Sequence, residues 1–430
     1  MEMKFIPVNF DYLGIGGDTY IQIFGRDSSG KRVCVLDKFL DWFYVLNRRK
    51  SEIEKIKLNG SFVKVQEEEK NYLGRPVKAL KVSCPHNMAK KFAEKIKGEI
   101  RELDINIISK YLLEKKLTPL TYWEVEGEIL SEEQLGGIAS VLEVNQVIKA
   151  NKIKQCKISD LSFHPKVLAY DIETTEFEIG RGEILMISLV GKNFKKVLTW
   201  KQSKNPCVET LKDEADMIEQ FIKYVKQYSP DFLVGYFSDG FDLPYLRARA
   251  EKNKIKLSLG LDNSVPTFTR GRVLSGKING ITHIDLLKFI ETAYSQYLQS
   301  ETLSLNEVAS ELIGEKKHDV SHIDFNNMKN ISQKQWEDFF EYNLQDSVLT
   351  YRLFEKVWPD ILEFSRIIGE PPYNVAREGM SQNVENYILH NLYKFNEIAE
   401  KRPTHDEISR KKDMFFNKSL YFITNSLEIS

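Results

Sequence analysis

The chain has 430 residues, 42% of them hydrophobic, which is enough to bury a globular core and allows roughly three domains of about 150 residues each. Its 61 Lys and Arg residues balance 62 Asp and Glu residues to a net charge of −1, which excludes a global attraction to nucleic acid or to an anionic membrane. The four cysteines form no CxxC or His-rich pattern, which argues against a zinc site and against a disulfide framework.

Residues 1–160 predict an α+β domain. Short strands are expected at Tyr20–Phe24 and Val33–Leu36, and a helical stretch is expected near Met88–Ile100. A basic connector, Lys149–Lys157, closes this domain. No apolar run approaches the length of a membrane span, and residues 1–10 lack the pattern of a signal peptide, so we expect a soluble intracellular protein without membrane contact.

Residues 161–357 predict a second domain, in which strands come first and helices are interleaved afterwards. That order favours an α/β fold, a mixed sheet covered by helices, within a chain that is α+β overall. An amphipathic helix places Met217 and Val225 on one face. The other expected elements are strands at Val167–Ile172, Ile184–Val190, Lys196–Trp200, Phe232–Tyr236 and His283–Leu287, and helices at Leu243–Lys254 and Gln333–Val357.

Residues 358–430 predict a helical segment. Leu362–Leu392 is apolar at helical spacing and is interrupted by Gly369–Pro372, where the prolines must break the helix. Two helices joined by a turn are therefore expected.

Two acids end the first strand of the second domain. In Tyr170-Asp171-Ile172-Glu173-Thr174, the alternation of a strand projects Asp171 and Glu173 to the same side. Paired carboxylates at a strand end can supply oxygen ligands to a divalent cation, so this run reads as half of a metal site. An Asp-x-Glu at a strand end is also common without any function.

Further candidates are Asp242, at a strand-to-helix junction, and Tyr342 with Asp346, one turn apart on the long helix. Taken alone, Asp242 could be a helix N-cap, and Tyr342 with Asp346 could be an exposed helical pair. Carboxylates about 4 Å apart repel by several kcal/mol at an effective dielectric near 20, so converging acids require cations. An all-oxygen ligand set favours Mg²⁺ or Mn²⁺.

Three segments of the chain resemble the three exonuclease motifs of the family B DNA polymerases. They are Tyr170–Thr174, Gly235–Tyr245 and Tyr342–Asp346. Residues 1–160 resemble the archaeal type of N-terminal domain in that family. His283–Leu286 is similar to the strand between the second and third motifs, and Ser365–Gly369 and Arg377–Asn396 are similar to the stretch that leads toward the palm.

The resemblance implies a ribonuclease H-like exonuclease domain with two Mg²⁺ or Mn²⁺ ions. By it, Asp171 would bridge both ions, Glu173 and Asp346 would complete the first site, and Asp242 would hold the second ion through water. Tyr342 would orient the attacking water, since a phenol with a pKa near about 10 is a poor base at neutral pH but a good hydrogen-bonding guide. The implied reaction releases a nucleoside monophosphate from a single-stranded 3′ end.

The sequence departs from the family in two places. The second motif usually carries an asparagine where this chain has Phe237, which either stacks on a base or packs in the core; Phe237 and Phe241 are candidate substrate contacts. The paired palm aspartates are also absent: Ser419–Tyr421 echoes the first palm motif, but Phe416 and Phe422 stand at the expected aspartate and proline. We therefore expect no polymerase activity from this chain alone.

The favoured hypothesis is the proofreading 3′-5′ exonuclease portion of a split or truncated family B polymerase. Its expected partners are single-stranded or primer-template DNA and a separate palm-containing chain, and its expected place is the cytoplasm, at the nucleoid. A non-catalytic DNA-binding or scaffold remnant of such a polymerase is the alternative. A stand-alone exonuclease that trims RNA is a third hypothesis, which the polymerase-like flanks disfavour.

Overall fold

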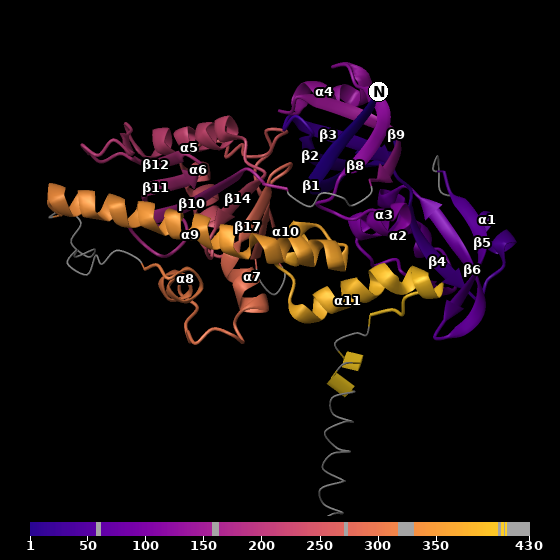
Figure 1. The fold of residues 1–430 in the computed structure, drawn as a ribbon. Coiled ribbons are helices and arrows are strands. Elements are labelled where there is room, and N and C mark those ends of the chain that lie inside the picture. The colour runs from indigo at the N-terminus through magenta and orange to yellow at the C-terminus, as the bar shows by residue number, and fades with distance from the viewer. Residues whose placement is uncertain are drawn as a thin grey trace, which may run out of the picture. The chain divides into compact units, whose positions relative to one another are not determined.

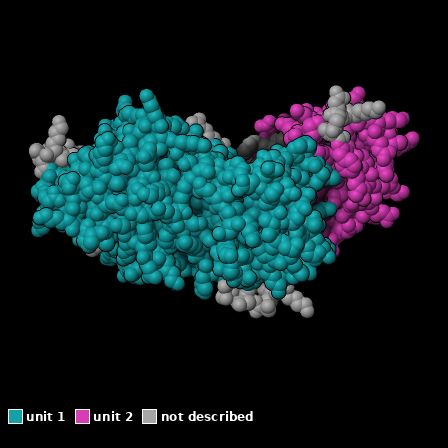
Figure 2. Space-filling view, turned by 90° about the horizontal axis from the view of Figure 1, so that it is seen from above, with its two compact units in different colours: residues 1–40, 106–390 teal, residues 41–105, 391–430 magenta. Residues whose placement is uncertain are grey.

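The computed structural model describes residues 1–56, 62–156, 163–270, 274–316, 331–402, 406–407 and 409–410. Figure 2 colours two compact units, residues 1–40 with 106–390 and residues 41–105 with 391–430. The expected palm-like echo at Phe416–Phe422 and the domain boundary expected after residue 160 lie outside the described residues. The three domain ranges therefore stay predictions.

The larger unit begins with a closed five-stranded barrel (Figure 1). Its strands follow the order β1-β2-β3-β9-β8. The expected strands at Tyr20–Phe24 and Val33–Leu36 are confirmed as parts of β2 and β3, whereas barrel closure depends on long-range pairing of Met3 with Val125. The elements of this part are β1 (Glu2–Ile15), β2 (Asp18–Asp27), β3 (Arg32–Lys38), α3 (Ile107–Lys115), β8 (Trp123–Ile129), η1 (Gln134–Gly137), α4 (Ile138–Val141) and β9 (Gln146–Gln155).

A six-stranded mixed sheet of order β13-β12-β11-β10-β14-β17 follows in the same unit. Its strands are β10 (Val167–Thr174), β11 (Ile184–Gly191), β12 (Phe194–Thr199), β13 (Val208–Thr210), β14 (Phe232–Gly235) and β17 (Thr282–Asp285). The central strand β10 runs antiparallel to β11 and parallel to β14, with Asp171 opposite Ser188 and Ala169 opposite Val234. The predicted mixed sheet flanked by helices is confirmed.

Helices cover both faces of this sheet (Figure 1). On one face, α5 (Glu214–Tyr228) and α6 (Asp242–Lys252) bury their apolar stripes against Leu168, Tyr170 and Ile172. On the other face lie α7 (Leu286–Ala293), α8 (Leu305–Ile313) and α9 (Gln333–Ile368). A two-stranded ribbon, β15 (Thr267–Arg270) and β16 (Leu274–Lys277), precedes β17. Because side chains alternate along β10, its odd-numbered residues face α9.

Local sequence explains where α9 begins and ends. A capping box of Ser332 and Gln335 starts the helix, and Gly369 ends it with a backbone φ of 85°. The expected end at Val357 was wrong, because the helix continues through Pro359 to Ile368. The aromatic side chains of Phe354 and Trp358 are buried around the proline and hold this stretch helical.

Two other expected elements were too long. The strand expected at His283–Leu287 ends at Asp285, whose side chain accepts a hydrogen bond from the Leu287 amide and caps α7. The helical stretch expected near Met88–Ile100 ends at Ala93, and residues 99–101 form a strand instead. In both cases the apolar pattern of the sequence continues past the residue where one helix or strand ends and the next element begins.

The predicted break at Gly369–Pro372 is confirmed, since α9 ends at Ile368, but two helices follow the break where the sequence predicted one. They are α10 (Pro372–Val375) and α11 (Met380–Asn391). The polar residues Asn383 and Asn386 are buried, while the apolar stripe of α11 is exposed: Met380, Val384, Tyr387 and Ile388. Within the described ranges, no helix is both long and apolar enough to cross a membrane.

The smaller unit is a four-stranded sheet of order β5-β6-β4-β7 with its own core. Its elements are β4 (Asp41–Leu46), α1 (Lys50–Glu54), β5 (Lys64–Tyr72), β6 (Arg75–Cys84), α2 (His86–Ala93), β7 (Glu99–Arg101) and η3 (Leu392–Phe395). The chain returns to this unit after α11, where the Asn71 amide donates to the Asn396 carbonyl at 2.8 Å and the Ile398 amide donates to the Asn71 carbonyl at 2.9 Å.

Candidate active site

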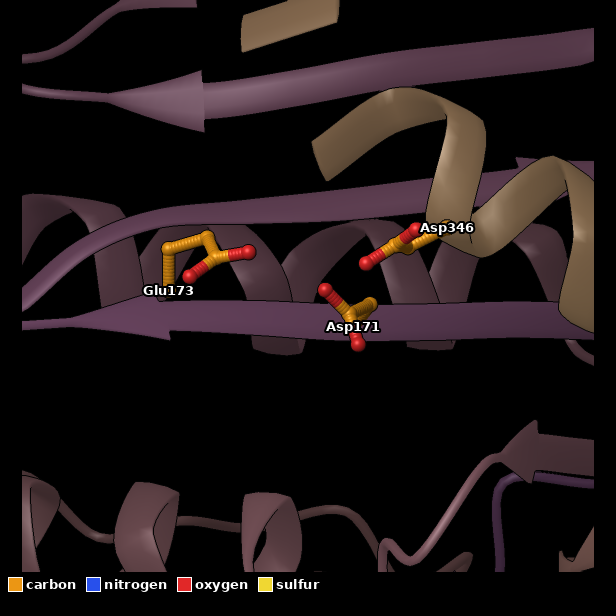
Figure 3. A group of neighbouring side chains, drawn as sticks. All are labelled: Asp171, Glu173 and Asp346. Atoms are coloured by element: carbon orange, nitrogen blue, oxygen red, sulfur yellow. The ribbon is translucent and has the colours of Figure 1, made fainter. Parts of the chain in front are cut away.

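Three acids meet where α9 crosses the end of β10 (Figure 3). Asp171 and Glu173 project from the strand, and Asp346 projects from the helix toward them. One carboxylate oxygen from each acid lies within 4.8 Å of the others. Asp346 is buried and the other two are half-buried, so the expectation of an exposed helical pair for Asp346 was wrong.

One of the acids, Asp171, is held by a polar side chain of α9. The Asn343 side-chain amide donates to Asp171 Oδ2 at 2.7 Å, and its backbone carbonyl accepts from Ser188 Oγ at 2.8 Å. Sequence reasoning missed Asn343. A signal was present, since Asn343, Asp346, Ser347 and Thr350 recur at helical spacing on a helix face that is otherwise apolar, and all four are buried.

Asp242 lies apart from the three-acid group but is bonded to the strand that carries two of its members. Its Oδ1 accepts a hydrogen bond from the Ile172 amide at 3.1 Å, so the backbone between Asp171 and Glu173 is its partner. Asp242 is the first residue of α6 and Phe241 is the N-cap, so the N-cap expectation for Asp242 was wrong.

The surroundings of Asp242 make the ionised form of its carboxylate unfavourable. The pKa of Asp242 is raised to about 7, with burial as the largest cause; the hydrogen bond from the Ile172 amide opposes the rise, and the carboxylates of Asp285 and Asp346 add to it. A nearby cation favours the charged form of a carboxylate and lowers its pKa. The local charge balance around Asp242 therefore suits a cation-binding site.

Tyr342 lies on α9 one turn before Asp346. Its side chain is half-buried and its ring packs on Phe339, with the ring centroids 6.2 Å apart. The helix therefore sets the direction of both side chains, since residues four apart lie on the same face.

Phe237 opens the loop that leads to Asp242. It is 46% exposed, so of the two alternatives left open for it, packing in the core is wrong. Its backbone φ is 62°, a left-handed conformation that asparagine and glycine tolerate better than a bulky residue. Gly240 makes room for the ring, because a Cβ at Gly240 would lie 2.4 Å from Phe237 Cε2.

Two more aromatic side chains lie beside this loop. Phe241 is half-buried, with its ring centroid 5.3 Å from that of Tyr245 and 6.5 Å from that of Phe177. Phe177, in the loop after β10, is 93% exposed. Sequence reasoning missed Phe177, although its place four residues after Glu173 was a usable signal.

Comparisons with known proteins identify the domain that carries part of this site. Residues 98–308 match the DNA polymerase family B exonuclease domain, a range that includes Asp171, Glu173 and Asp242. The chain is 30% identical over 419 residues to a DNA polymerase of Pyrococcus glycovorans, covering 93% of this chain and 48% of that protein. It is also 30% identical over 422 residues to DNA polymerase 1 of Pyrococcus abyssi, covering 94% of this chain and 49% of that protein.

A solved structure shares the fold. The family B DNA polymerase of the hyperthermophilic archaeon Pyrobaculum calidifontis superposes with a TM-score of 0.79 at 23% identity, covering 94% of this chain and 52% of that chain. The chain belongs to the family B DNA polymerases, of which it matches the N-terminal and exonuclease portion. It spans about half the length of the curated relatives it matches.

The donor set of the acid group fits the metals that an exonuclease domain of this family implies. Its ligands are carboxylate oxygens alone, which Mg²⁺ and Mn²⁺ prefer over the softer metals. The group joins a strand and a helix, so both elements must be in place before a cation can bind.

Proposed function

We propose that this chain is a 3′-5′ exonuclease that hydrolyses the 3′-terminal phosphodiester of single-stranded DNA, in the role of proofreading. The observation that supports this proposal is the meeting of Asp171 and Glu173, which lie in the matched exonuclease domain, with Asp346 of α9. The same arrangement supports a site for two divalent ions.

The four acids would share the binding of two ions in the proposed reaction. Asp171, Glu173 and Asp346 would hold the first ion, Asp171 would also reach the second, and Asp242 would hold the second through water. Bound divalent ions supply an activated water and neutralise the charge that develops on the phosphate. Asn343 donates to one oxygen of Asp171 and so fixes which oxygen points into the site.

Tyr342 would orient the attacking water rather than remove its proton, since a phenol stays protonated at neutral pH. The exposed rings of Phe177 and Phe237, together with the half-buried Phe241, would stack on the terminal bases. A base-aromatic stack is worth about 1 to 3 kcal/mol and accepts any base, which suits an enzyme that must remove whichever nucleotide is wrong.

A nuclease assay on single-stranded and mismatched primer DNA, with and without Mg²⁺, tests the proposal. We expect Asp171→Ala, Asp242→Ala and Asp346→Ala each to lower the cleavage rate by at least about 10²-fold, because each removes several kcal/mol of charge stabilisation. Glu251→Ala, an exposed acid on α6, is the matched control and should cleave normally. Full activity of all three acid variants would refute the assignment.

The same assay decides between this function and the two alternatives. A scaffold remnant would bind DNA without cleaving it and would bind no Mn²⁺ in a titration; Phe237, where the family usually has an asparagine, is the observation that favours it. An enzyme that trims RNA would degrade an RNA oligonucleotide faster than the DNA of the same sequence.

A palm-bearing polypeptide is the proposed protein partner, and this chain is proposed to have no polymerase activity by itself. The relatives carry about as much chain again beyond the part matched here. In α11, the last helix of the larger unit, the usual distribution of side chains is inverted: two asparagines are buried and an apolar stripe is exposed. An exposed apolar stripe of this kind is typical of a protein interface. Co-purification with a palm-bearing chain tests the partnership.

A further inference from the structure

Arg377 is an arginine of the larger unit whose partners lie far from it in the sequence. It follows α10 directly, and its side chain is 7% exposed. Its Nε donates to Asp239 Oδ2 at 2.7 Å and its Nη2 to Asp239 Oδ1 at 3.1 Å. Its Nη1 donates to the His283 carbonyl at 2.7 Å. The guanidinium thus joins the C-terminal helical segment to a loop and to a strand of the sheet.

The charge of this pair is fixed. Burial opposes the ionisation of Asp239, but the Arg377 guanidinium and His283 outweigh it and hold the pKa of Asp239 well below its ordinary value. A two-point contact between a guanidinium and a carboxylate also fixes the angle between them, which a lysine cannot reproduce.

Asp239 is the middle of the loop that carries Phe237 and ends at Asp242. Its Oδ1 also accepts from the Gly276 amide at 2.8 Å, and its own amide donates to Asp285 Oδ2 at 3.0 Å. Asp285 Oδ1 accepts from the Phe237 amide at 2.9 Å. Asp285 therefore holds the loop through two of its backbone amides, and Asp239 joins the loop to Gly276 and, through a hydrogen-bonded ion pair, to Arg377.

His283 ties the same loop to the central strand. Its Nε2 lies 3.1 Å from Ser238 Oγ and 3.1 Å from the Tyr170 hydroxyl, and Tyr170 precedes Asp171. The Arg377 Nη2 lies 3.0 Å from His283 Nδ1. A shift of Arg377 would thus displace the loop at two residues, at Asp239 directly and at Ser238 through His283.

These contacts connect Arg377 to the acids of the candidate site. The loop sets the start of α6, since the Leu243 amide donates to the Ser238 carbonyl at 3.0 Å, and Asp242 then reaches the Ile172 amide between Asp171 and Glu173. We propose that Arg377 is a positioning residue, which holds the Asp239 loop so that Asp242 stays aligned with the acids of β10.

This inference rests on the proposed exonuclease function for its kinetic readout, and a second readout is independent of it. A misplacement of about 1 Å in a catalytic site costs on the order of 10² in rate. We therefore expect Arg377→Gln to lower kcat on single-stranded DNA by about 10²-fold with KM unchanged. In the same variant the Ile172 amide should exchange with deuterium faster, since its acceptor Asp242 moves.

Matched variants separate positioning from simple stability. Arg32→Gln removes another buried arginine that pairs with an aspartate, Asp231, at 3.4 Å and donates to the Pro230 carbonyl at 2.5 Å. It should lower the melting temperature and leave kcat and the Ile172 exchange rate unchanged. Arg377→Lys should restore part of kcat, and Arg377→Gln with Asp239→Asn should be no worse than the stronger single variant, because the two residues act as a unit.

The outcomes are distinct. If Arg377→Gln lowers only the melting temperature, as Arg32→Gln does, and leaves kcat and Ile172 exchange unchanged, the inference is wrong. If Arg377→Gln does not fold, the same comparison is decided by Arg377→Lys and Asp239→Asn. If the wild-type chain cleaves no DNA, the proposed function fails, whereas the Ile172 exchange rate in the variants still decides the positioning role.

Discussion

At the scale of single residues, Phe237 combines an unfavourable backbone with an exposed ring. Its left-handed φ costs on the order of 1 kcal/mol or more for a bulky residue, and such strain persists at sites where function requires it. Its ring nonetheless fits without a steric clash, because Gly240 has no side chain at the place where the ring lies. The stability of the fold and the proposed contact with substrate therefore place opposite demands on this position.

We predict that Phe237→Asn stabilises the folded chain by about 1 kcal/mol, since asparagine tolerates this backbone conformation. The same change should weaken binding of a single-stranded oligonucleotide by about 1 to 3 kcal/mol, the value of one lost base stack. Urea unfolding and fluorescence anisotropy measure the two effects.

Leu73→Asn is the control for this pair of measurements. Leu73 also has a positive φ, 53°, and is exposed, but it lies in the hairpin turn between β5 and β6 of the smaller unit. An asparagine before Gly74 suits such a turn, so this variant should gain stability with unchanged DNA affinity. Equal loss of DNA affinity in both variants would contradict the stacking role of Phe237.

At the scale of elements, a buried ion pair fastens two helices to the sheet beside the site. Glu214, in the first turn of α5, accepts from Arg249 Nε of α6 at 2.7 Å and from the Ile184 amide of β11 at 2.8 Å. Burial would raise the pKa of Glu214, but Arg249 and the Ile184 amide outweigh burial and lower it below its ordinary value of 4.5.

The sign of this shift predicts acid sensitivity. A carboxyl whose pKa is lower in the folded state stabilises the fold above its unfolded pKa, and that contribution is lost as the pH falls through the folded pKa. We predict that Glu214→Gln lowers the free energy of unfolding at pH 7 and flattens its decline between pH 5 and pH 3. Glu178→Gln, which alters an exposed ion pair with Arg181, should leave the free energy of unfolding unchanged at every pH. If the free energy of Glu214→Gln fell with pH as steeply as that of the wild type, Glu214 would not be the cause of the acid sensitivity.

Sequence periodicity predicted most strands and helices of the sheet domain, because each buries one face and so shows a period of two or 3.6. The end of α9 was not predictable from local rules: Pro359 argues for a stop, and the buried aromatics around it decide otherwise. Barrel closure and the bond from Asn343 to Asp171 also escaped prediction. Both depend on segments that are far apart in the chain and meet only after folding.

The acids themselves were predictable for a different reason. Asp171 and Glu173 share a strand face by alternation alone, and Asp346 belonged to a recognisable motif. What the sequence could not supply was the difference between them and Asp242, which bonds to the backbone of β10 and lies outside the three-acid group.

At the scale of the whole molecule, the exposed apolar stripe of α11 is the surface where the proposed palm-bearing chain would bind. We expect Val384→Glu with Ile388→Glu to abolish co-purification with a palm-bearing chain from the same genome, because two charges would be buried at the interface. Nuclease kinetics of this chain should be unchanged. Tyr297→Glu, an exposed residue between α7 and α8, is the control and should keep the partner.

Two results would contradict this assignment of the α11 face. One is a monodisperse monomer in the presence of the palm-bearing chain. The other is self-association of this chain, detected by sedimentation and removed by the same two glutamates, which would give the face to a second copy instead.

The acid group has a consequence for how the chain is held together. Asp346 comes from a helix, while Asp171 and Glu173 come from a strand that precedes it by most of the domain. A divalent ion bound between them would act as a cross-link that closes this long loop of chain. Metal binding and folding would then be linked equilibria, so removal of the ion by a chelator would lower the free energy of unfolding.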